Sequence, residues 1–340
     1  MRAVHAGGAH ECAPYGVARG AFGAPPLILG GGMGGLSRPT GSDWATVVGL
    51  SVIWGASFMN VKMALTGFGP LTIGAGRIVL ATLVLVALAR WMGLRLPGFG
   101  NATERRIWMH VAGMAFFSNA LPFFLLGWGQ RHVASGFAGI TMAAVPLFTM
   151  VLAQWFVPGE RMTAAKVAGF GLGIAGVVVL IGPAALIAKG GAVEEVARLS
   201  CVAAALSYSI GSVVTRRCPP MHMVAFSAAA LLCAGFMAVP MALLVEGVPD
   251  LAAAPVRAGL AVVYLGLLPT ALATVLMVRV INGAGPVFLT LSNYQVPVWS
   301  VIFGVLVLGE RLPGQFLAAL GLILAGLAVT QAGGWMRWSR

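Results

Sequence analysis

The stretch PLFTMVLAQWFVPGERMTAAKVAGFGLGIAGVVVL, residues 146–180, has a second copy later in the chain. Residues 297–329 read PVWSVIFGVLVLGERLPGQFLAALGLILAGLAV, with the same order of a proline, an apolar run, Gly-Glu-Arg and a Gly-rich apolar segment. Four pairs of residues are separated by 150 positions: Glu160 and Glu310, Arg161 and Arg311, Gly171 and Gly321, and Gly176 and Gly326. The chain therefore contains an internal repeat of about 150 residues.

The composition places this repeat in a membrane. Of the 340 residues, 59% are hydrophobic and only 9% are charged. A soluble domain carries about 25% charged residues, because its surface faces water. Most of this surface must therefore face lipid, and the unbroken apolar runs indicate helices rather than the alternating strands of a membrane barrel.

Ten transmembrane helices are expected, since each crossing of the hydrocarbon core needs about 20 apolar residues. The apolar runs place them at 44–64, 70–91, 107–128, 134–155, 163–183, 196–215, 222–245, 256–278, 285–308 and 313–333. The first repeat is then 44–183 and the second 196–333. Residues 1–43, rich in Gly, Ala and Pro, are expected to form a disordered N-terminal tail.

Each repeat contains five helices, an odd number, so the second copy must cross the membrane upside down relative to the first. We therefore expect an all-α integral membrane protein built from two inverted five-helix repeats. Inverted repeats are typical of transporters that open alternately to the two sides around a site at the membrane midplane. This architecture favours transport over the alternatives of a channel or a membrane scaffold.

The basic residues predict the orientation. Fourteen Lys and Arg residues fall in the tails and loops of one side, against six on the other. Because cytoplasmic loops are enriched in positive charge, both termini are expected in the cytoplasm. The net charge of +12 does not indicate nucleic-acid binding, since the basic residues lie singly or in pairs between apolar runs.

The sequence offers no pattern for catalysis. The four cysteines lack metal-type spacing, no metal or cofactor site is expected, and no phosphate-binding GxxxxGK[ST] motif occurs. A membrane enzyme acting on lipid-linked substrates would need clustered Asp, His, Glu or Cys, so this alternative is the least favoured. We expect a protein that is not an enzyme.

The residues Ile53-Trp54-Gly55-Ala56-Ser57-Phe58, the segment Pro70 to Arg77 and the two Gly-Glu-Arg segments resemble the drug/metabolite transporter superfamily, in its EamA-like branch. The resemblance covers about residues 44–333. It implies ten helices in two EamA repeats, a cavity between the halves, and movement of small metabolites, often as efflux across the bacterial inner membrane. The element corresponding to Trp54–Phe58 is weak in the second half, where Tyr208-Ser209-Ile210-Gly211-Ser212 stands.

Polar groups inside a span are costly, so each is a candidate for substrate binding. In the first span Trp54, Phe58 and Lys62 share a face at four-residue spacing, flanked by Ser57 and Asn60. This pattern predicts a cavity wall with an aromatic platform. The alternative is that Trp54 packs against a neighbouring helix while Lys62 extends to the interface.

Arg77, eight positions into the second span, is the strongest single candidate for a functional residue. It could bind a substrate carboxylate or bond to the carbonyl groups of neighbouring helices, and both interpretations stay open. The remaining candidates for the site are Asn119, Tyr264, Asn293, Tyr294 and Gln295. Together these groups suit a small polar or amphipathic molecule.

These features predict a secondary transporter that exports small metabolites, such as amino acids, nucleoside-like metabolites or drugs. Its partners would be the small-molecule substrate and the lipid bilayer. Gly169 and Gly173, with Gly321 and Ala325 as counterparts, have the spacing that lets helix backbones approach closely. Packing within the chain is the simpler use of these residues, and a homodimer is the alternative.

Overall fold

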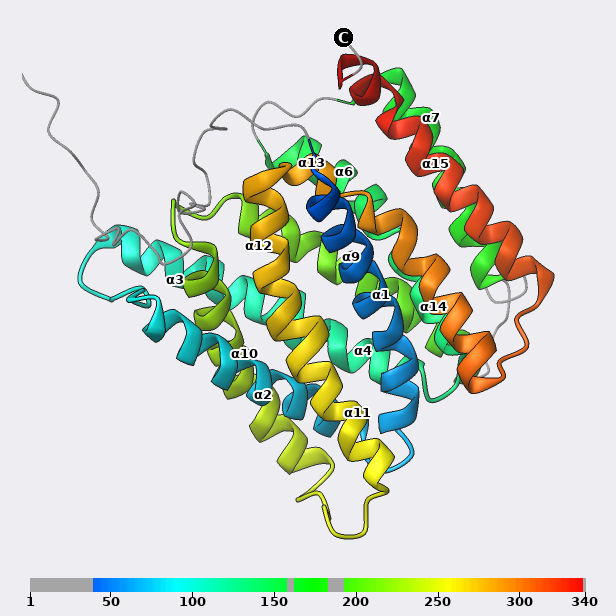
Figure 1. Cartoon of the computed structure of the whole chain (residues 1–340). Coiled ribbons are helices and arrows are strands. Elements are labelled where there is room, and N and C mark those ends of the chain that lie inside the picture. Colours follow the sequence, from blue (N-terminus) through cyan, green and yellow to red (C-terminus); the bar gives the residue numbers. More distant parts are fainter. Residues whose placement is uncertain (1–38, 158–161, 183–192, 339–340) are drawn as a thin grey trace, which may run out of the picture.

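The computed structural model describes residues 39–157, 162–182 and 193–338 and is all-helical (Figure 1). The first half contains α1 (Gly41–Ala64), α2 (Pro70–Trp91), α3 (Ala102–Met114), η1 (Ala115–Ala120), α4 (Leu121–Gly129), α5 (Ser135–Met142), α6 (Val145–Phe156) and α7 (Ala164–Ile181). The second half contains α9 (Val193–Arg216), α10 (Met223–Val245), α11 (Val256–Gly266), η2 (Leu267–Leu272), α12 (Ala273–Gly283), α13 (Pro286–Leu289), α14 (Ser292–Leu308) and α15 (Gly314–Trp338).

The expected spans correspond to these helices. In the described parts of the chain, nine helical segments are long and apolar enough to cross a membrane, with α3–η1–α4 and α11–η2–α12 each forming one continuous segment of 28 residues. The remaining segment, α14, has 17 residues and is preceded by the short α13. The all-helical membrane fold predicted from the sequence is confirmed.

The first helix begins slightly earlier than the apolar run. Thr40 caps α1 by accepting from the backbone N–H of Asp43, and the Asp43 carboxylate accepts from the backbone N–H of Thr40 at 2.8 Å. This reciprocal pair satisfies amide groups that have no partner within the helix. The helix therefore starts at Gly41, three residues before Trp44. Most of the expected tail, residues 1–38, lies outside the described residues.

Side-chain contacts show that α1 and α9 run in opposite directions. Ser42, at the start of α1, accepts a hydrogen bond from Arg279 near the end of the eighth span. Ser200, near the start of α9, donates to Leu125 O near the end of the third span. This contact joins the start of α9 to the end of the third span, so these two helices are antiparallel. The first and third spans run in the same direction because two crossings separate them. Helix α9 is therefore also antiparallel to α1. The two halves are inverted copies.

Related helices of the two halves pack in related ways (Figure 1). Helix α1 packs along α14, and its counterpart α9 packs along α6. Helices α2 and α10 pack against each other, as do α7 and α15, which lie side by side at one edge of the molecule.

Glycines allow the close approach of α7 and α15. A Cβ placed on Gly169 would lie 2.5 Å from Gly326 O, and one on Gly326 would lie 2.6 Å from Gly169 O. Gly173 and Gly176 also face the α15 side or the core, whereas Gly171 and Gly321 face open space. The spacing of Gly169 and Gly173 therefore serves packing within the chain, whereas their counterparts Gly321 and Ala325 are exposed on α15.

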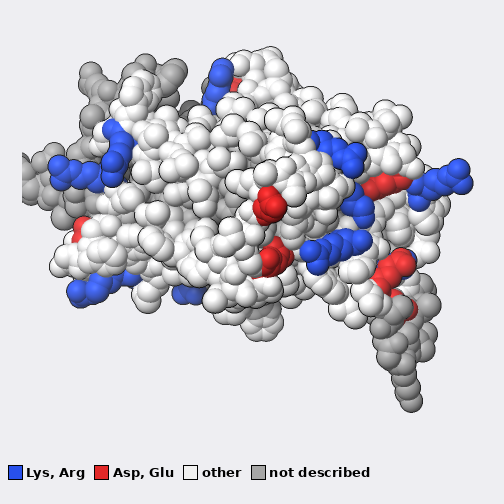
Figure 2. Space-filling model, turned by 90° about the horizontal axis from the view of Figure 1, so that it is seen from below, with Lys and Arg blue, Asp and Glu red and all other residues white. Residues whose placement is uncertain are grey.

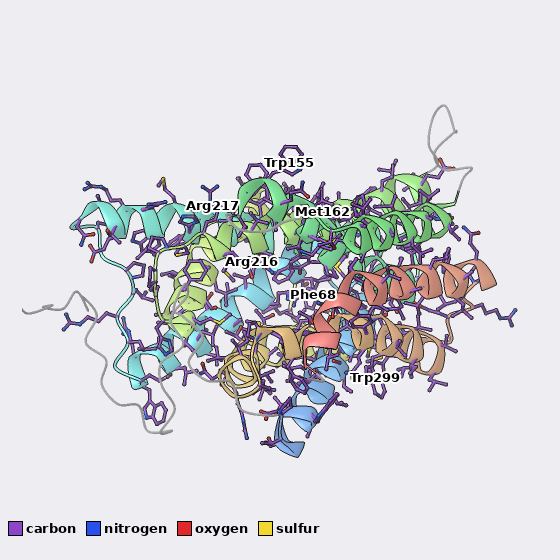
Figure 3. All side chains as sticks on the ribbon, turned by 90° about the horizontal axis from the view of Figure 1, so that it is seen from above. Phe68, Trp155, Met162, Arg216, Arg217 and Trp299 are labelled. Carbon is purple, nitrogen blue, oxygen red and sulfur yellow. The ribbon has the colours of Figure 1, made fainter. Side chains whose placement is uncertain are left out.

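The surface fits a lipid environment. Figure 2 shows uncharged residues over most of one face, with Lys, Arg, Asp and Glu in small separate groups. Large apolar side chains such as Phe236 and Leu306 are exposed on the outside of the bundle. Trp155 is 77% exposed and points away from the helices in Figure 3. Lipid chains can cover such side chains at no hydrophobic cost.

Candidate functional site

The third and eighth spans each contain one widened π-helical turn at a related position, η1 and η2. Asn119 in η1 donates to Met114 O at 3.2 Å, and Thr270 in η2 donates to Leu265 O at 2.8 Å. Both bonds reach back five residues, and the two polar residues are 151 positions apart. Pro269 lies in η2 and Pro122 is the second residue after η1, and the missing N–H of each proline interrupts the α-helical ladder. Such π-bulges occur frequently at functional sites.

Arg77 of α2 contacts both of these spans. Its Nη2 donates to Thr270 Oγ1 at 3.1 Å, and its guanidinium carbon lies 3.8 Å from the centroid of the Phe123 ring, which follows η1. The side chain is only 8% exposed, and its Nε has no hydrogen-bond partner. Tyr208 of α9 lies within electrostatic range of this cation. Arg77 is therefore a buried charge in contact with one hydroxyl and one aromatic ring.

No carboxylate balances Arg77 among the described residues. Their acidic side chains all lie at helix ends or in loops: Asp43, Glu104, Glu194, Glu195, Glu246, Asp250 and Glu310. The position in α10 that corresponds to Arg77 falls in the run Ala228-Ala229-Ala230, so the cation occurs in one half only. The described residues also contain no group of three His, Cys, Asp or Glu side chains that could hold a metal ion.

Trp54 and Tyr264 join α1 to the eighth span next to η2. Trp54 Nε1 donates to Pro269 O at 3.1 Å, and the Tyr264 hydroxyl donates to Ile53 O at 3.1 Å. Trp54 thus satisfies a carbonyl of the π-helical turn that also carries the partner of Arg77. Of the residues proposed from the sequence, Trp54, Arg77 and Tyr264 are brought together at η2, with Asn119 at the related turn of the other half.

Other candidates from the first span bond to their own helix. Ser57 donates to Trp54 O, and Asn60 donates to Ala56 O at 2.9 Å. Phe58 is 6% exposed and belongs to the main apolar cluster beside Gly139. Asn293, Tyr294 and Gln295 are half-buried at the start of α14, where Tyr294 packs against the same cluster.

Lys62 differs from the sequence interpretation of a shared face with Trp54. Its Nζ donates to Gln130 O at 2.6 Å and to Val133 O at 2.9 Å. These carbonyls belong to the turn between α4 and α5, so Lys62 ties α1 to the third and fourth spans rather than extending into a binding site. Burial of a cation is offset here by two carbonyl acceptors.

Glu310 makes hydrogen bonds at the same end of the molecule as Lys62. Its carboxylate accepts from Ser135 N at 2.7 Å and from Gly136 N at 3.1 Å, so it caps the N-terminus of α5. The Gly309 backbone, with φ 65°, lets the chain turn directly after α14. The helix that Glu310 caps belongs to the other half of the chain. Its repeat counterpart Glu160 lies outside the described residues.

Glu246 makes a second contact of this kind at the end of α10. Its carboxylate accepts from Leu71 N at 3.0 Å, Thr72 N at 2.8 Å and Thr72 Oγ1 at 2.7 Å, capping α2. We call this end of the molecule, with loops 65–69, 130–134, 246–255 and 309–313, the Glu310 end. The opposite end, where α9 ends at Arg216 and Arg217 follows (Figure 3), is the Arg217 end.

Two bundles follow from the contacts. Helix α1 is bonded to the eighth span through Ser42, Ile53 and Trp54 and packs on α14; we call these the α1 bundle. Helix α9 is bonded to the third span through Ser200 and Ser207, and Ser209 donates to Val145 O of α6 at 2.9 Å. We call α9, the third span, α5 and α6 the α9 bundle. Arg77 touches both bundles.

Sequence reasoning alone missed part of this arrangement. Phe123 looks like any apolar residue of a span, and only the fold places it under the guanidinium of Arg77. In the sequence, the spacing of apolar residues does not distinguish the π-helical turns from α-helix. Prolines 122 and 269 are the one signal that could have indicated them.

Relatives with known names support the membrane-transport assignment. A probable terminal-alkyne amino-acid exporter of Streptantibioticus cattleyicolor is 29% identical over 84% of this chain and 91% of its own length. The inner membrane transporter YedA of Escherichia coli, described as uncharacterized, is 26% identical over 84% and 89%. An S-adenosylmethionine/S-adenosylhomocysteine transporter of Chlamydia trachomatis is 27% identical over 81% and 84%.

The fold and the family agree with these relatives. A solved crystal structure matches with a TM-score of 0.60 at 24% identity, covering 87% of this chain and 98% of its own, and supports the fold. The model of the EamA-like transporter family matches twice, over residues 44–182 and 197–331, as the repeat requires. The chain, with its two inverted five-helix halves, belongs to the EamA-like transporter family.

Proposed function

We propose that this chain is a secondary transporter that exports small metabolites from the cytoplasm, with its α1 and α9 bundles rocking against each other. The observation that carries the proposal is the unequal packing of the two ends. In an inverted repeat, each contact between bundles at one end has a counterpart at the other. A carrier in one of its two states makes these contacts at one end only.

At the Glu310 end the bundles are closed. Helix α5 of the α9 bundle packs along α14 of the α1 bundle. A Cβ on Gly139 would overlap the Ser300 side chain, and one on Gly304 would lie 3.1 Å from Ser135 Oγ. The caps made by Glu310 and the bonds of Lys62 also cross between the bundles here.

At the Arg217 end the corresponding contact is lacking in the described parts of the chain. The counterparts of α5 and α14 are α13 and α6, and these do not pack along each other. The pair α5 and α1, which pack against each other, corresponds to the pair α13 and α9. Helices α13 and α9 do not pack against each other. The conformation is therefore that of a carrier closed at the Glu310 end. With the Arg217 end in the cytoplasm of a bacterial cell, this conformation faces inwards.

Relatives suggest the substrate class. An amino-acid exporter and a transporter of S-adenosylmethionine both handle small molecules with an amino-acid group. We propose substrate contacts from the residues around the two π-helical turns and the start of α14: Trp54, Ser57, Phe58, Asn60, Arg77, Asn119, Tyr264, Asn293, Tyr294 and Gln295. No specific observation favours a channel or an enzyme.

Transport by the purified protein in proteoliposomes should saturate with substrate and show counterflow. Vesicles preloaded with unlabelled amino acids, nucleosides or cationic drugs should accumulate the labelled form of the true substrate against its gradient. A carrier does this because loaded sites exchange across the membrane, whereas a channel dissipates gradients without exchange. Empty vesicles are the control, and saturation without counterflow would contradict the proposal.

Cysteine labelling should place the two ends on opposite sides of the membrane. A cysteine at Gly98, in the loop after α2, should react with an impermeant maleimide only in inverted vesicles. A cysteine at Ala253, at the Glu310 end, should react in intact cells, because the basic loops of the Arg217 end are retained inside. Reaction of both positions from the same side would exclude this topology.

A further inference from the structure

We infer that Arg77 is an anion subsite that binds the carboxylate of the transported molecule, which defines the substrate as a small carboxylate-bearing solute. This inference rests on the proposed transport function, and it follows from three observations on the residues around Arg77.

The first observation is an incomplete set of partners. A guanidinium has five N–H donors, and Arg77 uses one of them in the bond to Thr270. Its Nε is buried with no acceptor, and the side chain is more than nine-tenths buried. A buried charge without partners is strongly unfavourable, so an additional acceptor is expected when the site is occupied.

The second observation concerns the charge of that acceptor. Elsewhere the chain satisfies a half-buried cation with backbone oxygens, as for Lys62 with Gln130 O and Val133 O. Around Arg77 the contacts are a hydroxyl already donating to Leu265 O and the face of Phe123, with Tyr208 within electrostatic range. None carries a negative charge. A carboxylate matches the paired N–H groups of a guanidinium and supplies the missing charge.

The third observation is the position of the group between the bundles. Thr270 belongs to the α1 bundle and Phe123 to the α9 bundle, and each lies in or next to a π-helical turn. A ligand bound to the guanidinium is therefore beside both moving parts. The aromatic ring of Phe123 offers apolar surface to the rest of a small molecule.

Binding of matched probes tests this inference without requiring transport. The full-length protein in detergent is heated with an equimolar mixture of the neutral amino acids, or with the same mixture as C-terminal amides, which lack the carboxylate. Only the acids should raise the melting temperature, because a ligand stabilises the state that it binds. Equal stabilisation by both mixtures, or by neither, overturns the inference.

Variants assign the effect to one residue. Arg77→Gln should weaken acid binding about 10- to 100-fold, the loss expected for a charge-assisted hydrogen-bond pair, and Arg77→Lys should retain part of it. Arg90→Gln, on the exposed end of the same helix, should bind like the wild type. Wild-type affinity in a folded Arg77→Gln protein overturns the inference. If that variant does not fold, the comparison of acids with amides in the wild type still decides.

The outcome is distinct from that of the transport assay. Binding of acids through Arg77 without counterflow in proteoliposomes would support the subsite and reject the carrier. Counterflow of amides or cations that is unchanged in Arg77→Gln would support the carrier and reject the subsite.

Discussion

A disulfide between cysteines introduced at Ser135 and Gly304 should reduce transport to the level of empty vesicles, and a reductant should restore it. The two positions lie on α5 and α14, on either side of the closed contact at the Glu310 end. A Cβ on Gly304 would lie 3.1 Å from Ser135 Oγ, the atom whose place the Sγ of a cysteine would take, so the two cysteine side chains would be adjacent. The hydroxyl of Ser135 has no hydrogen-bond partner, so replacing it breaks no bond.

The size of the effect follows from the proposed mechanism. A carrier must separate α5 from α14 in each cycle to release its substrate, and a covalent bond between them prevents this completely. The measurement is counterflow before and after oxidation, in a protein whose native cysteines are replaced by alanine. The Glu310 carboxylate, whose Oε2 is 2.5 Å from the new Cβ, must shift to admit the bond and loosens its hydrogen bond from Gly136 N. Each single cysteine variant should transport normally.

A second disulfide serves as the matched control. A Cβ on Gly113 would lie 3.7 Å from Val214 Cβ, so cysteines at these positions should also form a bond. This pair joins α3 to α9 within the α9 bundle, next to the contact of His110 Nδ1 with Val214 O at 2.8 Å. Because these helices move together, transport should continue after oxidation. Loss of transport in the control, or continued transport with the Ser135–Gly304 bond formed, would refute the rocking of these two bundles.

Replacement of Gly326 by alanine should destabilise the protein by about 1–3 kcal/mol, the usual cost of an added methyl group in a packed interior. The new Cβ would lie 2.6 Å from Gly169 O and 2.7 Å from Gly173 N. Both are backbone atoms of α7, which cannot rotate away as a side chain can, so the two helices must separate. Gly169→Ala should have a similar effect, since its Cβ would meet Gly326 O at 2.5 Å.

The repeat supplies its own controls. Gly171 and Gly321 are related by the same 150-residue spacing but face open space, with no atom within 4 Å of an added Cβ. Alanine at either position should leave the melting temperature unchanged or raise it slightly, because alanine favours helix more than glycine does. Thermal unfolding in detergent of all four variants measures the difference. Equal melting temperatures for Gly326→Ala and Gly321→Ala would show that α7 and α15 do not pack in this way.

Much of the fold could be predicted because lipid imposes it on the sequence. A span must be apolar over its full length, so runs such as 70–91 are visible without any knowledge of their neighbours. The inversion follows from counting five helices between Glu160 and Glu310. The pairing of α7 with α15 was less certain, because a GxxxG spacing favours close packing equally well within a chain and between chains.

The site was harder to predict because side-chain partners depend on the packing of distant segments. Arg77 could be recognised from its charge, yet Thr270 is 193 residues away and its contact exists only in the folded bundle. Lys62 and Trp54 share a helix face in the sequence, but the first bonds to the turn after α4 and the second to η2. Ser57 and Asn60 bond to their own helix, as short polar side chains in spans often do.

The cap made by Glu310 bears on which state the empty protein occupies. Its carboxylate satisfies two backbone amides across the bundles, at Ser135 and Gly136. Opening this end would leave the amides of α5 to water, and no described contact at the other end offers an equivalent gain. In the orientation proposed above, the resting population is thereby biased towards the form that faces the cytoplasm. For an exporter, this bias makes the empty molecule ready to load in the compartment where its cargo is made.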